Sequence, residues 1–142
     1  MTLATVEQLI EEISRGGMVI LIDDANRENE GDLVLAAESI TAEQVNFLAT
    51  HARGLICAPL GSEIVERLQL PKMHSQPSDP TECAFTISVD SRDGISTGIS
   101  AFDRAHTLRQ LAHPDSTPGH FNRPGHIFPL KAKPGGILSR RG

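Results

Sequence analysis

The chain opens with apolar residues that recur every three or four positions over residues 6–13, which is the spacing of one helix face. Thr5 and Gln8 have the form of a capping box ahead of this stretch, and Gly16-Gly17 ends it. Residues 18–22 then form an apolar run without polar alternation, which is typical of a strand buried on both faces. We therefore predict an amphipathic opening helix followed by a central strand.

Two further helices are predicted in the middle of the chain. A second capping box at residues 41–44 opens a helix that runs to about His51. Ser62 begins a shorter helix, which ends before Pro71 because the residue ahead of a proline disfavours helical backbone angles. Between these helices, the apolar residues 55–58 predict a strand.

The second half of the chain is less regular. Residues 71–83 are rich in Pro, Ser, Asp and Lys without periodicity, which predicts a long surface loop. Residues 85–90 alternate apolar and polar side chains, so we predict a strand with one apolar and one polar face. Ser100 and Asp103 have the spacing of a helix start, and this helix should end before Pro114. The last third is thick with Pro and Gly, and no element is predicted there.

This mixture of elements predicts an α+β fold in which helices cover a mixed β-sheet, because strands and long helices do not alternate regularly. At 142 residues and 39% hydrophobic content, the chain suits one ordinary core, so we expect a single domain over residues 1–142. The pattern leaves the topology open.

Composition excludes several classes of partner. The net charge is −5, and no basic run is longer than Arg140-Arg141, which argues against binding to duplex nucleic acid. The N-terminus lacks a leader pattern, and no uncharged stretch has the length of a membrane span, so we expect a cytoplasmic protein without a membrane partner. Cys57 and Cys83 lack metal-ligand spacing, and we expect both to be reduced.

Negative charge is concentrated in residues 23–32, Asp-Asp-Ala-Asn-Arg-Glu-Asn-Glu-Gly-Asp, which hold five carboxylates and one arginine. Like charges this close repel one another, so a folded protein keeps them when a cation, a bound substrate or open solvent offsets the repulsion. Carboxylate oxygens are the ligands that Mg²⁺ and Mn²⁺ prefer, and Arg27 can grip a carboxylate or phosphate bidentately. Two interpretations remain open at this point, a metal site and a solvated acidic turn.

Two more segments need a joint explanation with residues 23–32: Gly-Ile-Ser-Thr-Gly-Ile-Ser-Ala-Phe-Asp-Arg at 94–104 and Asn-Arg-Pro-Gly-His-Ile-Phe-Pro-Leu at 122–130. Together the three closely resemble the 3,4-dihydroxy-2-butanone 4-phosphate synthase family of riboflavin biosynthesis, over residues 18–142. The resemblance implies a lyase that converts D-ribulose 5-phosphate to 3,4-dihydroxy-2-butanone 4-phosphate and formate. It also implies Mg²⁺ or Mn²⁺ as cofactor and a homodimer with sites near the subunit interface.

The resemblance assigns roles to individual residues. Glu28 matches the metal-binding glutamate of the family and is expected to be catalytic. An alternative reading of the acidic segment is that Arg27 and Asp32 merely pair with each other, and Ser100 has helix capping as a compatible simpler role. The substrate contacts that the resemblance implies are at Arg27, Glu28, Asp32, Thr97, Ser100, Asp103, Arg140, Arg141 and Gly142.

His126 is the second expected catalytic residue. It follows Arg-Pro-Gly, a stiff and then flexible lead-in that can aim an imidazole, and it matches a histidine that the family needs for activity. Cys57 matches a family cysteine beside the substrate, although a small buried hydrophobe is the simpler interpretation. The remaining histidines lack such support and are taken as structural or exposed: His51, His74, His106, His113 and His120.

The resemblance stops at residue 142, where the family continues with Gly-His-Thr-Glu-Ala. That continuation carries the second metal ligand, a substrate-binding threonine and, further on, a catalytic glutamate. A metal held by Glu28 and water alone should bind weakly. We therefore expect a longer natural gene product, an incomplete domain that can lack activity, and exposed apolar surface that favours aggregation or a partner.

Two other functions stay open. The first is a non-catalytic remnant that binds sugar phosphate or metal, or a dimerising scaffold for another subunit. The second is a generic phosphosugar isomerase, which fits an acidic metal loop but explains the Arg-Pro-Gly-His segment poorly.

Overall fold

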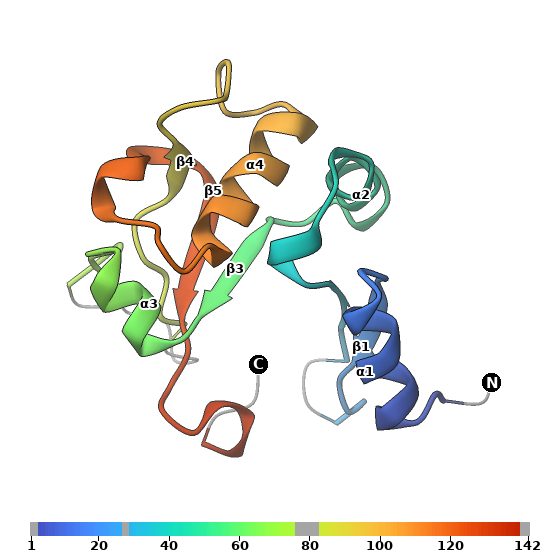
Figure 1. The fold of residues 1–142 in the computed structure, drawn as a ribbon. Helices are drawn as coiled ribbons and strands as arrows, with labels where there is room; N and C mark the ends of the chain where they lie inside the picture. The colour runs from blue at the N-terminus through green and yellow to red at the C-terminus, as the bar shows by residue number, and fades with distance from the viewer. Residues whose placement is uncertain (1–2, 27–28, 76–82, 140–142) are drawn as a thin grey trace.

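The computed structural model describes residues 3–26, 29–75 and 83–139. Its elements run along the chain from the blue N-terminal helix to the red C-terminal turn (Figure 1). The α-helices are α1 (Val6–Ser14), α2 (Ala42–Phe47), α3 (Ser62–Arg67) and α4 (Ala101–Ala112). The strands are β1 (Val19–Ile22), β2 (Gly31–Val34), β3 (Cys57–Leu60), β4 (Val89–Ser91) and β5 (Phe121–Lys131). Short 3-10 and π turns are η1 (Ala37–Ser39), η2 (Leu48–Ala52), η3 (Pro118–His120) and η4 (Gly136–Leu138).

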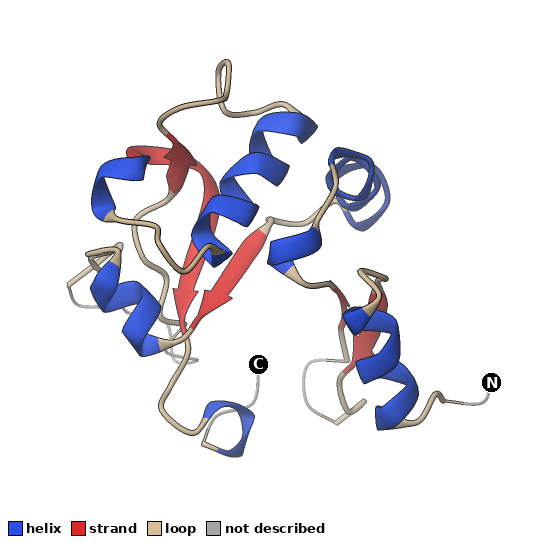
Figure 2. Cartoon of the chain, in the orientation of Figure 1, coloured by secondary structure: helices blue, strands red, loops and turns tan. Residues whose placement is uncertain are grey.

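The strands form two separate sheets. β1 and β2 make an antiparallel hairpin, and a second sheet has the order β3-β5-β4, with β5 parallel to β3 and antiparallel to β4. α4 lies against β4 and β5, and α2 packs on α4 (Figure 2). This mixed sheet with helices packed on it confirms the predicted α+β class.

The core lies between these helices and the three-stranded sheet. Leu68, Leu111 and Ile127 are fully buried and belong to one apolar cluster, contributed by the end of α3, by α4 and by β5. This cluster fixes the position of β5, which carries one of the segments of chemical interest.

The predicted helix starts are confirmed in atomic detail. Thr5 accepts a hydrogen bond from the backbone N–H of Gln8, whose side chain accepts from the Thr5 N–H, and Thr41 and Gln44 repeat this reciprocal box. The predicted helix through about His51 is also confirmed, because α2 continues into the π turn η2.

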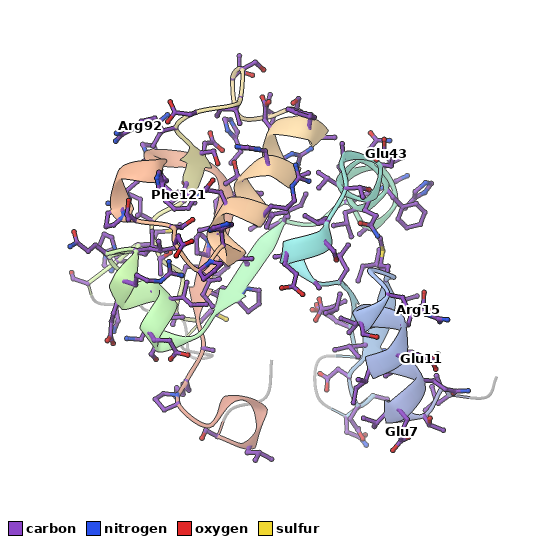
Figure 3. All side chains as sticks on the ribbon, in the orientation of Figure 1. Glu7, Glu11, Arg15, Glu43, Arg92 and Phe121 are labelled. Atoms are coloured by element: carbon purple, nitrogen blue, oxygen red, sulfur yellow. The ribbon has the colours of Figure 1, made fainter. Side chains whose placement is uncertain are left out.

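α1 is only partly covered. Figure 3 shows Glu7, Glu11 and Arg15 along one side of this helix, and Arg15 pairs with Glu11 at 3.7 Å. The opposite side is not fully buried either, since Val6 is 65% and Ile10 63% exposed. The amphipathic pattern was therefore a correct guide to helix formation but not to complete burial.

The prediction that residues 18–22 form a central strand buried on both faces is wrong. β1 pairs with β2 in a two-stranded hairpin, and only Val19 of this strand is buried. Ile20 is 61% exposed and Ile22 60%, because the described residues place no layer over either side chain. The hairpin therefore carries exposed apolar side chains.

The polar face predicted for residues 85–90 is buried in the fold. Thr86, Ser88 and Asp90 are all buried, while Phe85 and Ile87 are only half-buried. The polar side chains face β5 and hydrogen-bond to it; the Thr86 hydroxyl, for example, donates to the carbonyl of Pro129 at 3.2 Å. The alternation indicated a strand with two different faces. A polar face can be buried when the neighbouring strand supplies hydrogen-bond partners for its side chains.

The central strand β5 was not predicted at all. Prolines lack an N–H donor and are normally confined to sheet edges, and β5 contains Pro124 and Pro129. The sheet tolerates Pro124 because the ladder is interrupted there. Ile127 pairs with Val89, whereas Asn122 pairs with the next residue of β4, Asp90, so residues 123–126 bulge out of register. β3 also begins two residues later than the predicted strand.

Candidate functional site

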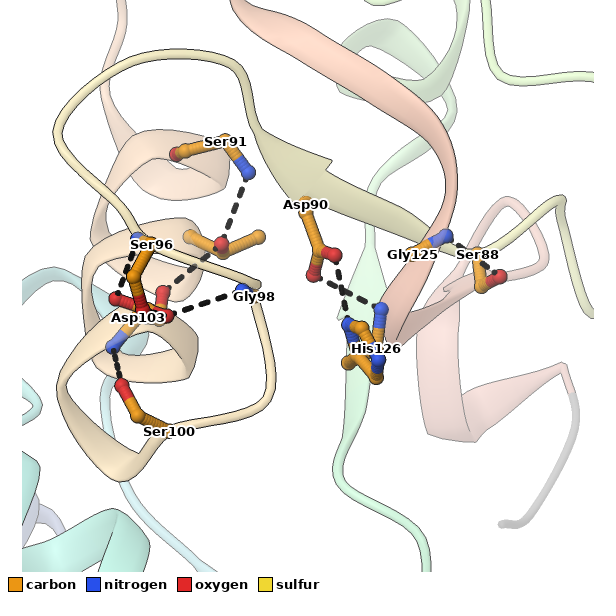
Figure 4. Close-up of polar contacts among 10 residues, drawn as sticks. Ser88, Asp90, Ser91, Ser96, Gly98, Ser100, Asp103, Gly125 and His126 are labelled. Carbon is orange, nitrogen blue, oxygen red and sulfur yellow. Dashed lines mark hydrogen bonds and ion pairs between the residues drawn. The ribbon is translucent and has the colours of Figure 1, made fainter.

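The bulge of β5 brings His126 against Asp90 of β4. The Nδ1 atom of His126 lies 2.7 Å from Oδ2 of Asp90, and the backbone N–H of His126 donates to Oδ1 of the same carboxylate at 2.9 Å (Figure 4). The Asp90 side chain is 9% exposed and the His126 side chain 40%. The pair therefore sits at the surface with the carboxylate behind the ring, and Nε2 is the ring nitrogen left for another partner.

Gly125 makes this approach of the two strands possible. A Cβ at this position would lie 2.1 Å from the carbonyl carbon of Val89, which no side chain can tolerate. The N–H of Gly125 donates to the Ser88 hydroxyl at 3.1 Å, and Arg123 donates to the carbonyl of Leu68 at 2.7 Å. Arg123 and Gly125 thus anchor the bulge to the rest of the fold.

The loop before α4 is organised around the buried carboxylate of Asp103. This carboxylate accepts hydrogen bonds from the hydroxyl and the N–H of Ser96, at 2.8 and 3.2 Å, and from the N–H of Gly98 at 3.0 Å. Burial alone raises the pKa of Asp103, but these hydrogen bonds outweigh it and hold the pKa below its ordinary value. The Ser100 hydroxyl accepts from the Asp103 N–H and caps α4, as its simpler predicted role requires.

Gly98 joins this loop to the histidine. Its φ is +93°, and a Cβ there would lie 2.1 Å from Oδ2 of Asp90 and 2.8 Å from Nδ1 of His126. The segments 94–104 and 122–130 therefore meet where Gly98 packs against His126. Thr97, which is exposed, lies next to this point along the chain. A contact of Thr97, Ser100 or Asp103 with substrate stays a prediction.

The hairpin of β1 and β2, which carries the described residues of the acidic segment 23–32, lies apart from the sheet that carries His126 (Figure 1). Asp23 accepts from the N–H of Asp24 at 2.7 Å, and Asp24 accepts from the N–H of Asn26 at 2.8 Å, so both carboxylates stabilise the turn of the backbone. Asp32 is exposed on β2. Within the described ranges, no three His, Cys, Asp or Glu side chains converge on a metal position. Some of the predicted site residues fall outside the described residues, namely Arg27, Glu28, Arg140, Arg141 and Gly142.

Cys57 links the hairpin electrostatically to the three-stranded sheet. Partial burial raises the pKa of its thiol, and the negative charge of Asp32 and the thiol of Cys83 add to this rise. Cys57 and Cys83, which are both described, form no disulfide. A raised pKa leaves less of the Cys57 thiol as thiolate, which is the reactive form.

We predict that Asp32→Asn accelerates alkylation of Cys57. Removing the nearby negative charge lowers the pKa of the thiol, so more thiolate is present at a given pH. Iodoacetamide labelling at pH 8, followed by peptide mass spectrometry, should show a rate increase of about two- to fivefold. Asp24→Asn, a matched change in the same hairpin, should leave the rate unchanged. Equal rates in wild type and Asp32→Asn would refute the electrostatic link.

Three of the other histidines have the structural or exposed roles that were expected. The Nδ1 atoms of His113 and His120 accept from the backbone N–H groups of Asp115 and Thr117, at 3.2 and 3.1 Å, and hold turns. The ring of His51 is exposed and lies 4.5 Å from that of a neighbouring phenylalanine on the same helical segment.

Comparison with known proteins places the chain in a family. A sequence profile of 3,4-dihydroxy-2-butanone 4-phosphate synthase matches residues 7–142. The chain belongs to this family. The synthase of Agrobacterium fabrum is 51% identical over 142 residues, which cover all of this chain and 67% of that protein. The riboflavin biosynthesis protein RibBA of Salinispora arenicola is 52% identical over 141 residues, which cover 99% of this chain and 34% of that protein.

A solved synthase structure has the same fold. The crystal structure of a 3,4-dihydroxy-2-butanone 4-phosphate synthase in complex with two magnesium ions matches with a TM-score of 0.96 and 48% identity, over 99% of this chain and 65% of that chain. The chain thus spans about one third to two thirds of the length of these synthase relatives. The family resemblance drawn from the three sequence segments is confirmed.

Sequence reasoning missed one residue of this candidate site. Asp90 was assigned only to the polar face of a strand, whereas it is buried and holds His126. The sequence did offer one signal: Asp90 is a carboxylate on a predicted strand that leads directly into the Gly-Ile-Ser-Thr-Gly segment. Spacing alone does not pair it with a histidine 36 residues further on.

Proposed function

We propose that the protein to which these residues belong acts as 3,4-dihydroxy-2-butanone 4-phosphate synthase. It converts D-ribulose 5-phosphate to 3,4-dihydroxy-2-butanone 4-phosphate and formate for riboflavin biosynthesis. Family membership supports the reaction class. The observation that carries the proposal is the meeting of two family segments at the Asp90–His126 pair, where a partly exposed imidazole is held by a buried carboxylate.

The chemistry of the substrate calls for such a group. Removing a proton from the carbon beside a ketone leaves an enediolate, and a positioned base is the principal requirement for that step. Nε2 of His126 accepts this proton in our proposal, because Nδ1 is already engaged by Asp90. The later rearrangement and the loss of formate also depend on positioned acids and bases rather than on a covalent nucleophile. The raised pKa of Cys57 agrees with this.

The hairpin carboxylates fit a divalent cation by donor type. Asp23 and Asp24 each use a carboxylate oxygen to accept a hydrogen bond from the backbone of the turn. We propose Glu28 as the ligand of Mg²⁺ or Mn²⁺, since both ions prefer oxygen ligands. A bound ion supplies a Lewis acid that stabilises negative charge on the substrate oxygens. We assign substrate contacts to residues of the segments 23–32 and 94–104 and to the end of the chain: Arg27, Glu28, Asp32, Thr97, Ser100, Asp103, Arg140, Arg141 and Gly142.

The assembly and location are also proposals. We propose a homodimer, and the apolar side chains at the start of α4 support a buried partner there, since Ile99 is 53% and Phe102 59% exposed. We place the reaction in the cytoplasm, because its substrate is a phosphorylated sugar. In the described parts of the chain, no helix has the length and apolar character needed to cross a membrane.

Formate release tests the proposed function. The full gene product, given D-ribulose 5-phosphate and Mg²⁺, should release formate, and His126→Ala should lower the rate by about 100-fold or more, the usual contribution of a general base. Glu28→Gln should lower the rate and weaken Mg²⁺ binding in a calorimetric titration. His51→Ala, the matched loss of an exposed histidine, should leave turnover unchanged.

The result that would count against the site is full turnover in both His126→Ala and Glu28→Gln. Substrate binding without formate release would favour the alternative, a non-catalytic module that binds sugar phosphate or metal. Release of an isomerised sugar phosphate in place of formate would favour a phosphosugar isomerase.

A further inference from the structure

We propose that Asp90 is the positioning residue of His126. Its carboxylate fixes the neutral imidazole as the tautomer that carries the proton on Nδ1, and so presents Nε2 as the proton acceptor. The catalytic part of this inference rests on the proposed function, whereas the tautomer itself does not.

The carboxylate grips the histidine at two points. Oδ1 accepts from the backbone N–H of His126 at 2.9 Å, and Oδ2 faces Nδ1 at 2.7 Å. An ionised carboxylate only accepts hydrogen bonds, so the proton between it and a neutral ring has to belong to Nδ1. Because both contacts come from one rigid group, they set the ring orientation as well as its tautomer (Figure 4).

The surroundings leave the pair little freedom. Asp90 is buried, and Gly98 is packed so tightly that a Cβ there would touch both Oδ2 of Asp90 and Nδ1 of His126. Gly98 is held in turn by its N–H donation to Asp103 at 3.0 Å. Asp103 thus fixes Gly98, Gly98 encloses Asp90, and Asp90 orients His126. The 40% exposure of the His126 side chain leaves its far side open.

Two other histidines provide an internal contrast. Nδ1 of His113 and Nδ1 of His120 each accept from a backbone N–H, so in the neutral ring their proton resides on Nε2. The structure therefore assigns opposite tautomers to His126 and to these two histidines. One spectrum of one sample can register that difference.

The experiment is long-range ¹H–¹⁵N correlation of the unaltered chain with ¹⁵N-labelled histidine, at about pH 8.5, where an ordinary imidazole is neutral. His126, assigned by its disappearance in His126→Gln, should show a protonated Nδ1. His113 and His120 should show a protonated Nε2. A protonated Nε2 in His126 would overturn the proposal, whether or not Asp90→Asn folds.

Asp90→Asn should invert the tautomer. The carboxamide oxygen can still accept from the His126 N–H, which turns the amide NH₂ toward Nδ1, so that Nδ1 accepts and the proton moves to Nε2. Formate release by the full gene product should then fall about 100-fold. Asp93→Asn, the same change at an exposed carboxylate three residues on, should alter neither readout.

The possible outcomes separate the two proposals. An unchanged tautomer in a folded Asp90→Asn overturns the positioning role. An inverted tautomer with unchanged turnover overturns its catalytic importance. A wild-type protein with the expected tautomer but no formate release overturns the proposed function and supports Asp90 as the group that orients His126.

Discussion

Gly125→Ala should lower the free energy of unfolding by about 3 kcal/mol or more. The added Cβ would meet Val89 and Asp90 at 2.1 to 2.4 Å, and the atoms in its way belong to the backbone of β4. A side chain can rotate away, but a paired strand cannot shift without breaking its ladder with β5. Urea unfolding followed by circular dichroism measures the loss.

The matched control is Gly54→Ala. A Cβ at Gly54 would meet no atom within 4 Å, so this variant should stay within about 0.5 kcal/mol of wild type. Equal stabilities for the two variants would show that β4 and β5 do not approach as closely as described. Because the bulge carries His126, any Gly125→Ala protein that still folds should also lose the Asp90–His126 contact.

Asp103→Asn should destabilise the fold by about 2 kcal/mol at pH 7, the cost of weakening a buried carboxylate's hydrogen bonds. Asp103 is 2% exposed and holds the loop over residues 96–98. An amide offers one acceptor oxygen in place of two, and its NH₂ group would face N–H or O–H donors. Urea unfolding at pH 7 tests this part of the prediction.

The pH dependence tests the charge. Because folding holds the pKa of Asp103 below its ordinary value of 3.8, the carboxylate contributes stability above that value and loses it as pH falls through the folded pKa. Unfolding free energies measured from pH 7 down to pH 3 should therefore fall less steeply in Asp103→Asn than in wild type. Asp115→Asn, at an exposed carboxylate, should follow the wild-type curve. Parallel curves for Asp103→Asn and wild type would show that no stabilising charge was removed.

Local signals in the sequence were reliable for helix starts, which depend on one short segment of backbone. Thr5 with Gln8, Thr41 with Gln44, and Ser100 each cap the helix that the pattern predicts. These contacts span three residues, so no distant part of the fold is needed to form them.

Signals that depend on distant partners were read wrongly. The run at β1 is apolar, but its burial depends on a covering layer that local pattern does not reveal, and Ile20 is exposed. Prolines argued against a strand at β5, yet a bulge accommodates Pro124 in the centre of the sheet.

The sequence by itself determined the helix starts, the α+β class and the family, because these follow from residues close together or from motifs read in order. Only the tertiary structure decided the central place of β5 and the pairing of His126 with Asp90. The physical reason is that a bulged, long-range ladder brings together side chains 36 residues apart. Nothing in the spacing of the chain encodes that register.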